Sequence, residues 1–295
     1  MAIPHCPNPE CEYAKRESAR FFHRHGHFVT KWNAQPVPRY RCRGCRRSFS
    51  THTFRETYRQ KKPFLNEPIF LWYASATTQR RIARVMQINR KTVVRKFLFM
   101  AGLAKAAHER AVWQAPLQTT TFQFDEMESF EHTRLKPLSI AVLLCGTTRK
   151  LLDIRVGSMP MRGMLSGVAI KKYGYRKDER PKLREAVFRK LGEALNGPCT
   201  MTTDSHLAYP RLIKTFLAKA RHLAVIRPKI PKRLGLPRPN PDDPLFAINH
   251  TAAKIRHDLS RMARKVWVTT KKAERLQLHL DLYVAFHNGY SLKTA

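Results

Sequence analysis

Three carboxylates, Asp125, Glu126 and Glu128, follow an alternation of Thr and Phe in the sequence TTFQFDEMESF at residues 120–130. The alternation is typical of a β-strand, so the acids are expected at its end. Acids are scarce here, with 21 Asp and Glu against 56 Lys and Arg and a formal net charge of +35. Carboxylate oxygens suit hard divalent cations such as Mg²⁺. On this stretch alone, two interpretations are equally supported: a cation site, or a surface loop whose acids pair with nearby arginines.

A second isolated acid, Asp204, ends another apolar run, CTMTTDSH at 199–206. In open α/β sheets, ligands gather at the ends of strands. If the strands that carry Asp125 and Asp204 are neighbours, the two carboxylates would share a metal ion.

The elements that must position these acids follow an α/β order. The pattern predicts strands at 120–127, 139–146, 151–159, 199–206 and 222–227, and helices near 185–195, 209–220, 246–265 and 272–287. A basic segment spans 162–180, and the proline-rich stretch 228–244 is expected to be an extended loop along a phosphate backbone.

Four cysteines form two tight pairs near the N-terminus, Cys6 and Cys11 in CPNPEC and Cys42 and Cys45 in YRCRGC. Four thiolates make a closed tetrahedral Zn²⁺ site. Residues 1–55 are too few to bury a sufficient core alone, so structural zinc is expected to hold a small ribbon together. The histidines at 23, 25 and 27 could compete as ligands but are interpreted as exposed strand positions.

The periodicity of apolar residues within 60–112 predicts helices separated by a break at Ile88–Asn89. A short turn between two helices, the second rich in Arg and Lys, is the pattern of a helix-turn-helix. The residues expected to contact DNA open these helices: Arg80, Arg81, Arg90, Lys91, Thr92 and Arg95. The alternative is an ordinary basic helical hairpin.

Length and composition restrict the class of protein. A chain of 295 residues is long enough for two or three domains, and a sequence pI near 10.7 implies a polyanionic partner, nucleic acid before an acidic membrane surface. No apolar run is long enough for a membrane span, and MAIPHCPNPEC lacks the apolar core of a signal peptide. Paired cysteines without a disulfide pattern are typical of a cytoplasmic protein.

These motifs together resemble the DDE transposases of the bacterial insertion sequence 1 and insertion sequence 1595 type. The resemblance covers the cysteine pairs, the helix-turn-helix, FDEMESF, TTDSHLAY and the C-terminal stretch 248–288, in the family's order.

The resemblance implies a ribonuclease-H-like α/β catalytic domain that uses three side chains to hold two Mg²⁺ ions. Asp125 and Asp204 match the family's first two acids, Asn249 stands where a Glu is expected, and Arg256 matches a basic residue two helical turns later. Some relatives of the insertion sequence 1595 group have Asn at this place. An Asn carbonyl can bind Mg²⁺ but brings no charge. The alternatives are an inactive derivative, or Asp243 or Glu128 standing in for the Glu.

The resemblance further implies a zinc ribbon at 1–55, a helix-turn-helix at 56–115 and a catalytic domain at 116–295. The expected activity is Mg-dependent strand cleavage and strand transfer on double-stranded DNA, at element terminal repeats and target DNA. A homo-oligomer on DNA, associated with the bacterial nucleoid, is expected. A DNA-binding regulator without catalysis and a nuclease without strand transfer are the other hypotheses.

Overall fold

A computed structural model describes residues 3–16, 20–31, 34–114, 117, 119–226, 242–263 and 268–290. They belong to two compact units, one within Met1–Pro68 and one within Ile69–Leu292. Most of the proline-rich stretch expected to follow a phosphate backbone lies outside the described residues. No helix in the described ranges combines the length and the apolar character that a membrane span requires.

The N-terminal unit has a short helix α1 (Glu12–Lys15) and an antiparallel sheet in the order β1 (Phe22–Val29), β2 (Pro36–Cys42), β3 (Ser48–Ser50). Two short turns of 3₁₀ helix follow at Thr51–Phe54 and Pro63–Leu65. Its core combines cysteines with aromatic rings, such as the stacked pair Phe21 and Phe49.

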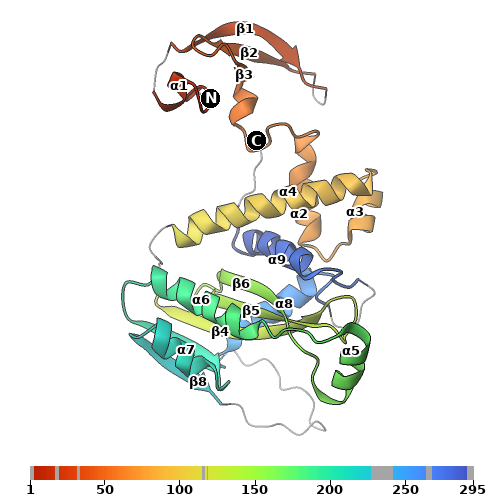
Figure 1. The fold of residues 1–295 in the computed structure, drawn as a ribbon, viewed down its shortest axis with the longest axis vertical. Coiled ribbons are helices and arrows are strands. Elements are labelled where there is room, and N and C mark those ends of the chain that lie inside the picture. The colour runs from red at the N-terminus through yellow and green to blue at the C-terminus, as the bar shows by residue number, and fades with distance from the viewer. Residues whose placement is uncertain are drawn as a thin grey trace. The chain divides into compact units, whose positions relative to one another are not determined.

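The second unit contains a mixed five-stranded sheet in the order β6-β5-β4-β7-β8 (Figure 1). The strands are β4 (Thr121–Phe130), β5 (Pro137–Cys145), β6 (Leu151–Ser158), β7 (Cys199–Asp204) and β8 (Ala220–Val225). The first three are consecutive and antiparallel, and β7 and β8 continue the sheet in parallel with β4. This confirms the expected α/β class.

Helices cover both faces of this sheet (Figure 1). Because side chains alternate along a strand, Phe122 and Phe124 of β4 pack toward α6 (Arg180–Ala194) and α7 (Tyr209–Phe216). Met127 faces the other way, toward α8 (Phe246–Asp258) and α9 (Ala273–His287). Asp125, two residues before Met127, therefore lies on the α8 face. The expectation that it ends its strand is wrong: Asp125 lies in the middle of β4, because pairing with β5 continues to Phe130.

Three helices precede the sheet: α2 (Asn66–Tyr73), α3 (Gln79–Val85) and α4 (Arg90–His108), the last continued by a π-helical turn at Glu109–Trp113. The predicted break is confirmed, because Asn89 ends it and caps α4 by accepting the Lys91 N–H through Oδ1 at 2.8 Å. The helix α4 packs along α9.

Several boundaries differ from those expected, because tertiary contacts override local periodicity. The helix α8 ends at Asp258, since Leu259 is extended and fully buried. The helix α7 ends at Phe216, and β8 starts at Ala220 because that residue pairs with Cys199. The basic segment 162–180 contains a helix, α5 (Ser166–Tyr173), that the periodicity did not reveal.

Candidate functional site

The register between β4 and β7 brings the two isolated acids to the same level of the sheet. Phe124 pairs with Thr203 in the parallel ladder, so the next residues of the two strands are Asp125 and Asp204. Met201 packs on the α6–α7 face, and the alternation therefore turns Asp204 toward the α8 face, as it does Asp125. The condition set for a shared metal ion, that these two strands are neighbours, is therefore met.

The start of α8 is fastened to β4 beside Asp125. The buried Gln123 donates from Nε2 to the Pro244 carbonyl at 2.7 Å and accepts the Ile248 N–H through Oε1 at 2.9 Å. Asn249 directly follows Ile248 and is half-buried, and Arg256 lies two turns further along the same helix. The Gln123 side chain thus links the two segments: Asp125 lies two residues after Gln123, and Asn249 lies one residue after its partner Ile248.

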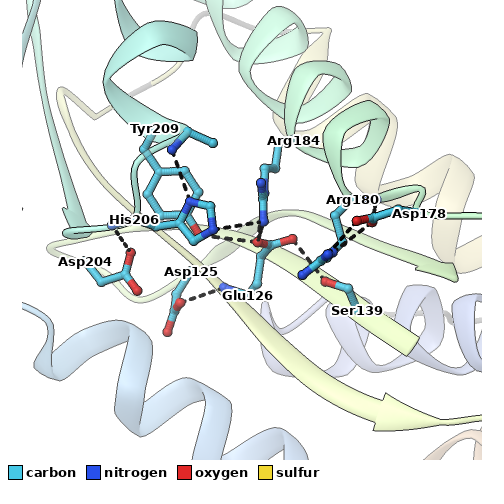
Figure 2. A network of polar contacts seen from close by, with 10 residues as sticks. Asp125, Glu126, Ser139, Asp178, Arg180, Arg184, Asp204, His206 and Tyr209 are labelled. Atoms are coloured by element: carbon cyan, nitrogen blue, oxygen red, sulfur yellow. Dashed lines mark hydrogen bonds and ion pairs between the residues drawn. The ribbon is translucent and has the colours of Figure 1, made fainter. Parts of the chain in front are cut away.

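Backbone amides orient both carboxylates. Asp125 Oδ1 accepts the Glu126 N–H at 2.7 Å, and Asp204 Oδ1 accepts the His206 N–H at 3.1 Å. In Figure 2 the two carboxylates lie on the side of the sheet that faces the pale blue ribbon of α8. Both residues are half-buried.

Glu126 points to the opposite face and is held by polar partners (Figure 2). It forms an ion pair with Arg184 of α6, whose Nε donates at 2.8 Å, and it accepts from Ser139 Oγ at 3.0 Å and Tyr209 Oη at 3.4 Å. Burial raises the pKa of the Tyr209 phenol, and the negative charges of Glu126, Asp204 and Asp125 raise it further. The nearby Arg184 acts in the opposite direction.

Three residues of this network, Arg184, His206 and Tyr209, were not among the site residues predicted from the sequence. Arg184 Nη2 also contacts His206 Nε2 at 3.5 Å, and His206 supplies the amide that orients Asp204. Only one signal was present: Arg184 shares a helical face with Val187, Phe188 and Leu191, an apolar stripe on which a cation needs a buried partner.

A similar pair lies beside this network at the start of α6. The guanidinium of Arg180 donates to Asp178, with Nε at 2.8 Å from Oδ1 (Figure 2). These hydrogen bonds lower the pKa of the Asp178 carboxyl and raise the pKa of Arg180.

The two acids considered as substitutes for the expected Glu lie at different positions. Glu128 is exposed and shares the strand face of Glu126, opposite to that of Asp125. Asp243 precedes α8 and accepts the Leu245 N–H through Oδ1 at 2.9 Å. Glu128 is thus unsuited to join Asp125, whereas Asp243 stays an alternative.

The four paired cysteines converge in the N-terminal unit. Their sulfur atoms all lie within 4.8 Å of one another, with Cys6 Sγ and Cys45 Sγ at 3.5 Å and Cys11 Sγ and Cys42 Sγ at 3.8 Å. A tetrahedron with Zn–S distances of about 2.3 Å has sulfur–sulfur edges of about 3.8 Å. These residues could therefore bind a metal such as zinc.

The environment of the cysteine cluster agrees with a metal site. Burial raises the pKa of the Cys6 thiol to about 12 and also raises the pKa of Cys42. For Cys45, burial acts in the same direction, but the Arg47 amide and neighbouring polar groups outweigh it and lower the pKa to about 7. A bound cation would favour the thiolates that burial alone opposes. The histidines of β1 at 23, 25 and 27 are exposed, as expected.

The basic residues expected to contact DNA lie on the outer surface of α3 and α4. The apolar residues Ile82, Val93 and Phe97 are buried. Thr92 is half-buried. The cations are all exposed: Arg80, Arg81, Arg90, Lys91 and Arg95. Arg80 and Arg90 line one cleft together.

No protein-family model matches the chain, and a search among curated proteins finds no match. The fold and the geometry of the sites therefore carry the functional proposal.

Proposed function

We propose that this protein is a DNA transposase of the DDE type, which cleaves and joins DNA strands with Mg²⁺. The sheet supports this proposal, because three antiparallel strands followed by two parallel ones, with β4 central, is the arrangement of a ribonuclease-H-like domain. The observation that carries it is the pairing of Phe124 with Thr203, which sets Asp125 beside Asp204 under α8.

The residues at this position fit a magnesium ion. Asp125 and Asp204 offer carboxylate oxygens and Asn249 an amide carbonyl, all of them hard donors on half-buried residues. Two divalent cations would activate the attacking hydroxyl or water and stabilise the leaving oxygen. The chain supplies the orientation, because the Glu126 and His206 amides and the Gln123 link hold the ligands before any cation binds.

In this proposal, DNA binding is the role of the basic helices α3 and α4 and of the unit that contains the cysteine cluster. We interpret α3 and α4 as a helix-turn-helix whose cations, from Arg80 to Arg95, contact terminal-repeat DNA. The cysteine cluster would hold zinc as a structural ion and shape a second DNA-contacting unit. Most of the affinity would come from phosphate contacts and would fall steeply with salt.

The test is a strand-cleavage and strand-transfer assay on DNA carrying the element ends, with Mg²⁺ or Mn²⁺. Asp125→Asn and Asp204→Asn are expected to lower activity at least ~100-fold, because each removes one of the site's two negative charges and with it several kcal/mol of stabilisation from the transition state. The matched control is Glu128→Gln, a carboxylate of the same strand on the other face, which is expected to keep activity. Full activity of Asp204→Asn would refute the metal site.

The Asn at position 249 favours a second candidate, a DNA-binding regulator without catalysis. Its uncharged carbonyl leaves the proposed site with two negative charges only. If the protein is a transposase, Asn249→Glu lowers the Mg²⁺ concentration needed for half-maximal cleavage, and Asn249→Ala raises it. A wild type that binds the element ends but neither cleaves nor transfers at any Mg²⁺ or Mn²⁺ concentration would support the regulator.

A further inference from the structure

A basic cleft lies within the second unit, between the helices α2–α4 and the segments on either side of α9's start. Its volume is about 630 Å³. The cationic lining residues come from four separate stretches of chain: Arg80, Arg90, Arg261, Lys271 and Arg275. None of the lining residues is Asp or Glu. A cleft with this lining strongly favours an anion.

These cations are not neutralised within the described part of the chain. Among its ion pairs, none includes a cation of the cleft. Arg261 donates from Nη1 to the Arg275 carbonyl at 3.1 Å, a single bond for a group that has five N–H donors. Burial lowers the pKa of the Arg261 guanidinium, with the nearby Tyr73 acting in the opposite direction. A partly buried guanidinium without a carboxylate is suited to a phosphate ligand.

The floor of the cleft is built from packed rings. Tyr73 stacks on Phe97 with centroids 4.7 Å apart, and His279 meets both rings edge-on at 5.3 and 5.8 Å. His279 Nε2 donates to the Tyr73 carbonyl at 3.0 Å, which ties α2 to α9. These contacts join α2, α4 and α9 into one packed base for the cleft.

The chain that follows the helix carrying Asn249 lines the same cleft, at Ser260 and Arg261. The Ala76 N–H donates to the Asp258 carbonyl at 2.7 Å, joining the link between α2 and α3 to the last residue of α8. Arg261 lies three residues beyond that point. An anion in the cleft would thus contact α3, α4 and the chain just after α8 at once.

We propose that this cleft binds a phosphate of the DNA backbone and so couples the DNA held by α3 and α4 to the unit that carries Asp125 and Asn249. The assignment rests on the proposed function, because DNA is the polyanion that Arg80 and Arg90 are expected to contact. A free inorganic anion has the same chemistry and is distinguished by experiment.

The experiment measures the affinity of the full chain for element-end DNA from 50 to 300 mM salt. The test variants are Arg275→Gln and Lys271→Gln, both exposed and hence tolerant of substitution, and the half-buried Arg261→Gln. The control is Arg211→Gln, an exposed arginine of α7 on the opposite side of the sheet. Each cleft variant is expected to weaken binding several-fold and to reduce the slope of log affinity against log salt by about 0.9 for each phosphate that is no longer neutralised, while Arg211→Gln matches the wild type.

The outcomes separate this proposal from the function on which it rests. A wild type that binds DNA, with slopes unchanged in Arg275→Gln and Lys271→Gln, overturns the cleft site and leaves the DNA-binding proposal standing. A wild type that does not bind DNA overturns both. In a parallel arm, inorganic phosphate is added and thermal stability is followed. A stabilisation of the wild type that is absent from Arg275→Gln, together with unchanged DNA slopes, would assign the cleft to a free anion and refute the DNA phosphate.

Discussion

Two arginines of the same helix, α6, each form an ion pair with a glutamate, and together they allow a controlled measurement of what holds the candidate site in position. Arg184 pairs with Glu126, the neighbour of Asp125, and the two side chains are 8% and 13% exposed. Arg189 pairs with Glu185 one turn away, and these side chains are 54% and 45% exposed. Replacing each arginine by glutamine removes the same charge from the same helix.

The expected magnitudes differ because solvent screens only the second pair. Removing one partner of a buried pair costs roughly 3–5 kcal/mol, since the other charge is left without its counterion. Glu126 keeps its hydrogen bonds from Ser139 and Tyr209, so the low end, about 3 kcal/mol, is expected for Arg184→Gln. An exposed pair four residues apart contributes only about 0.3–0.5 kcal/mol, which is the expected cost of Arg189→Gln.

Thermal and urea unfolding of the full chain, followed through the transition of the second unit, checks this. About 3 kcal/mol corresponds to a fall in Tm of roughly 6–12 °C for a unit of this size, against about 1–2 °C for the control. The double variant Glu126→Leu with Arg184→Met is expected to recover part of the stability, because apolar residues of similar size replace a buried pair well, whereas the buried Ser139 and Tyr209 hydroxyls lose their acceptor. Equal destabilisation by Arg184→Gln and Arg189→Gln would refute the view that the pair is a buried support of the site.

Three further outcomes are expected. Zinc chelation, or Cys42→Ala, should unfold the N-terminal unit, visible as loss of its NMR dispersion while the second unit keeps its own; an unchanged spectrum would contradict a structural metal. Gly192→Ala should destabilise the protein by ~1–3 kcal/mol, because a Cβ would lie 2.3 Å from the Phe216 carbonyl oxygen. Gly102→Ala, in the middle of α4 and with nothing within 4 Å of the added Cβ, should stabilise it by about 0.5–1 kcal/mol. A change of the same sign in both variants would refute the close approach at Gly192. Burial, and to a lesser degree the charge of Arg261, lowers the pKa of His279 to about 3. Below about pH 6.5 the imidazole is therefore protonated in the unfolded state but not in the folded state, so the free energy of unfolding should fall as the pH drops toward 3. His279→Gln should show a shallower fall, and a pH profile identical to that of the wild type would contradict a buried neutral imidazole.

The sheet was predictable where the local pattern and the tertiary environment agree. The runs at 120–127, 139–146 and 151–159 became β4, β5 and β6, since alternating or continuous apolar residues suit strands covered on one or both faces. The cysteine pairs met as expected, because their spacing already forms two knuckles. Helix ends were less predictable, as Leu259 and Leu217 show, because the core decides where a buried leucine leaves the helix.

The sequence predicted the acids of the candidate site, but not the residues that hold the surrounding elements in position. Asp125 and Asp204 stood out because carboxylates are rare in so basic a chain. Asp204 does end β7, whereas Asp125 lies within β4, because the local pattern did not show that the strand continues to Phe130. Arg184 lies 58 residues from Glu126 in sequence and Gln123 lies 125 from Ile248, so no local pattern links either pair. The roles of Asn249 and Arg256 toward a metal or a phosphate stay predictions.

By itself, the sequence determined the classes of residue and their local order: thiolates in two knuckles, cations on two short helices and isolated acids after apolar runs. These depend on periodicity and spacing, which act over a few residues. Only the tertiary structure decided that β7 pairs in parallel beside β4, that Asp125 and Asp204 share one face, and that five cations from distant segments line one cleft. Strand order and helix packing are set by the burial of surfaces far apart in the chain, which no local pattern encodes.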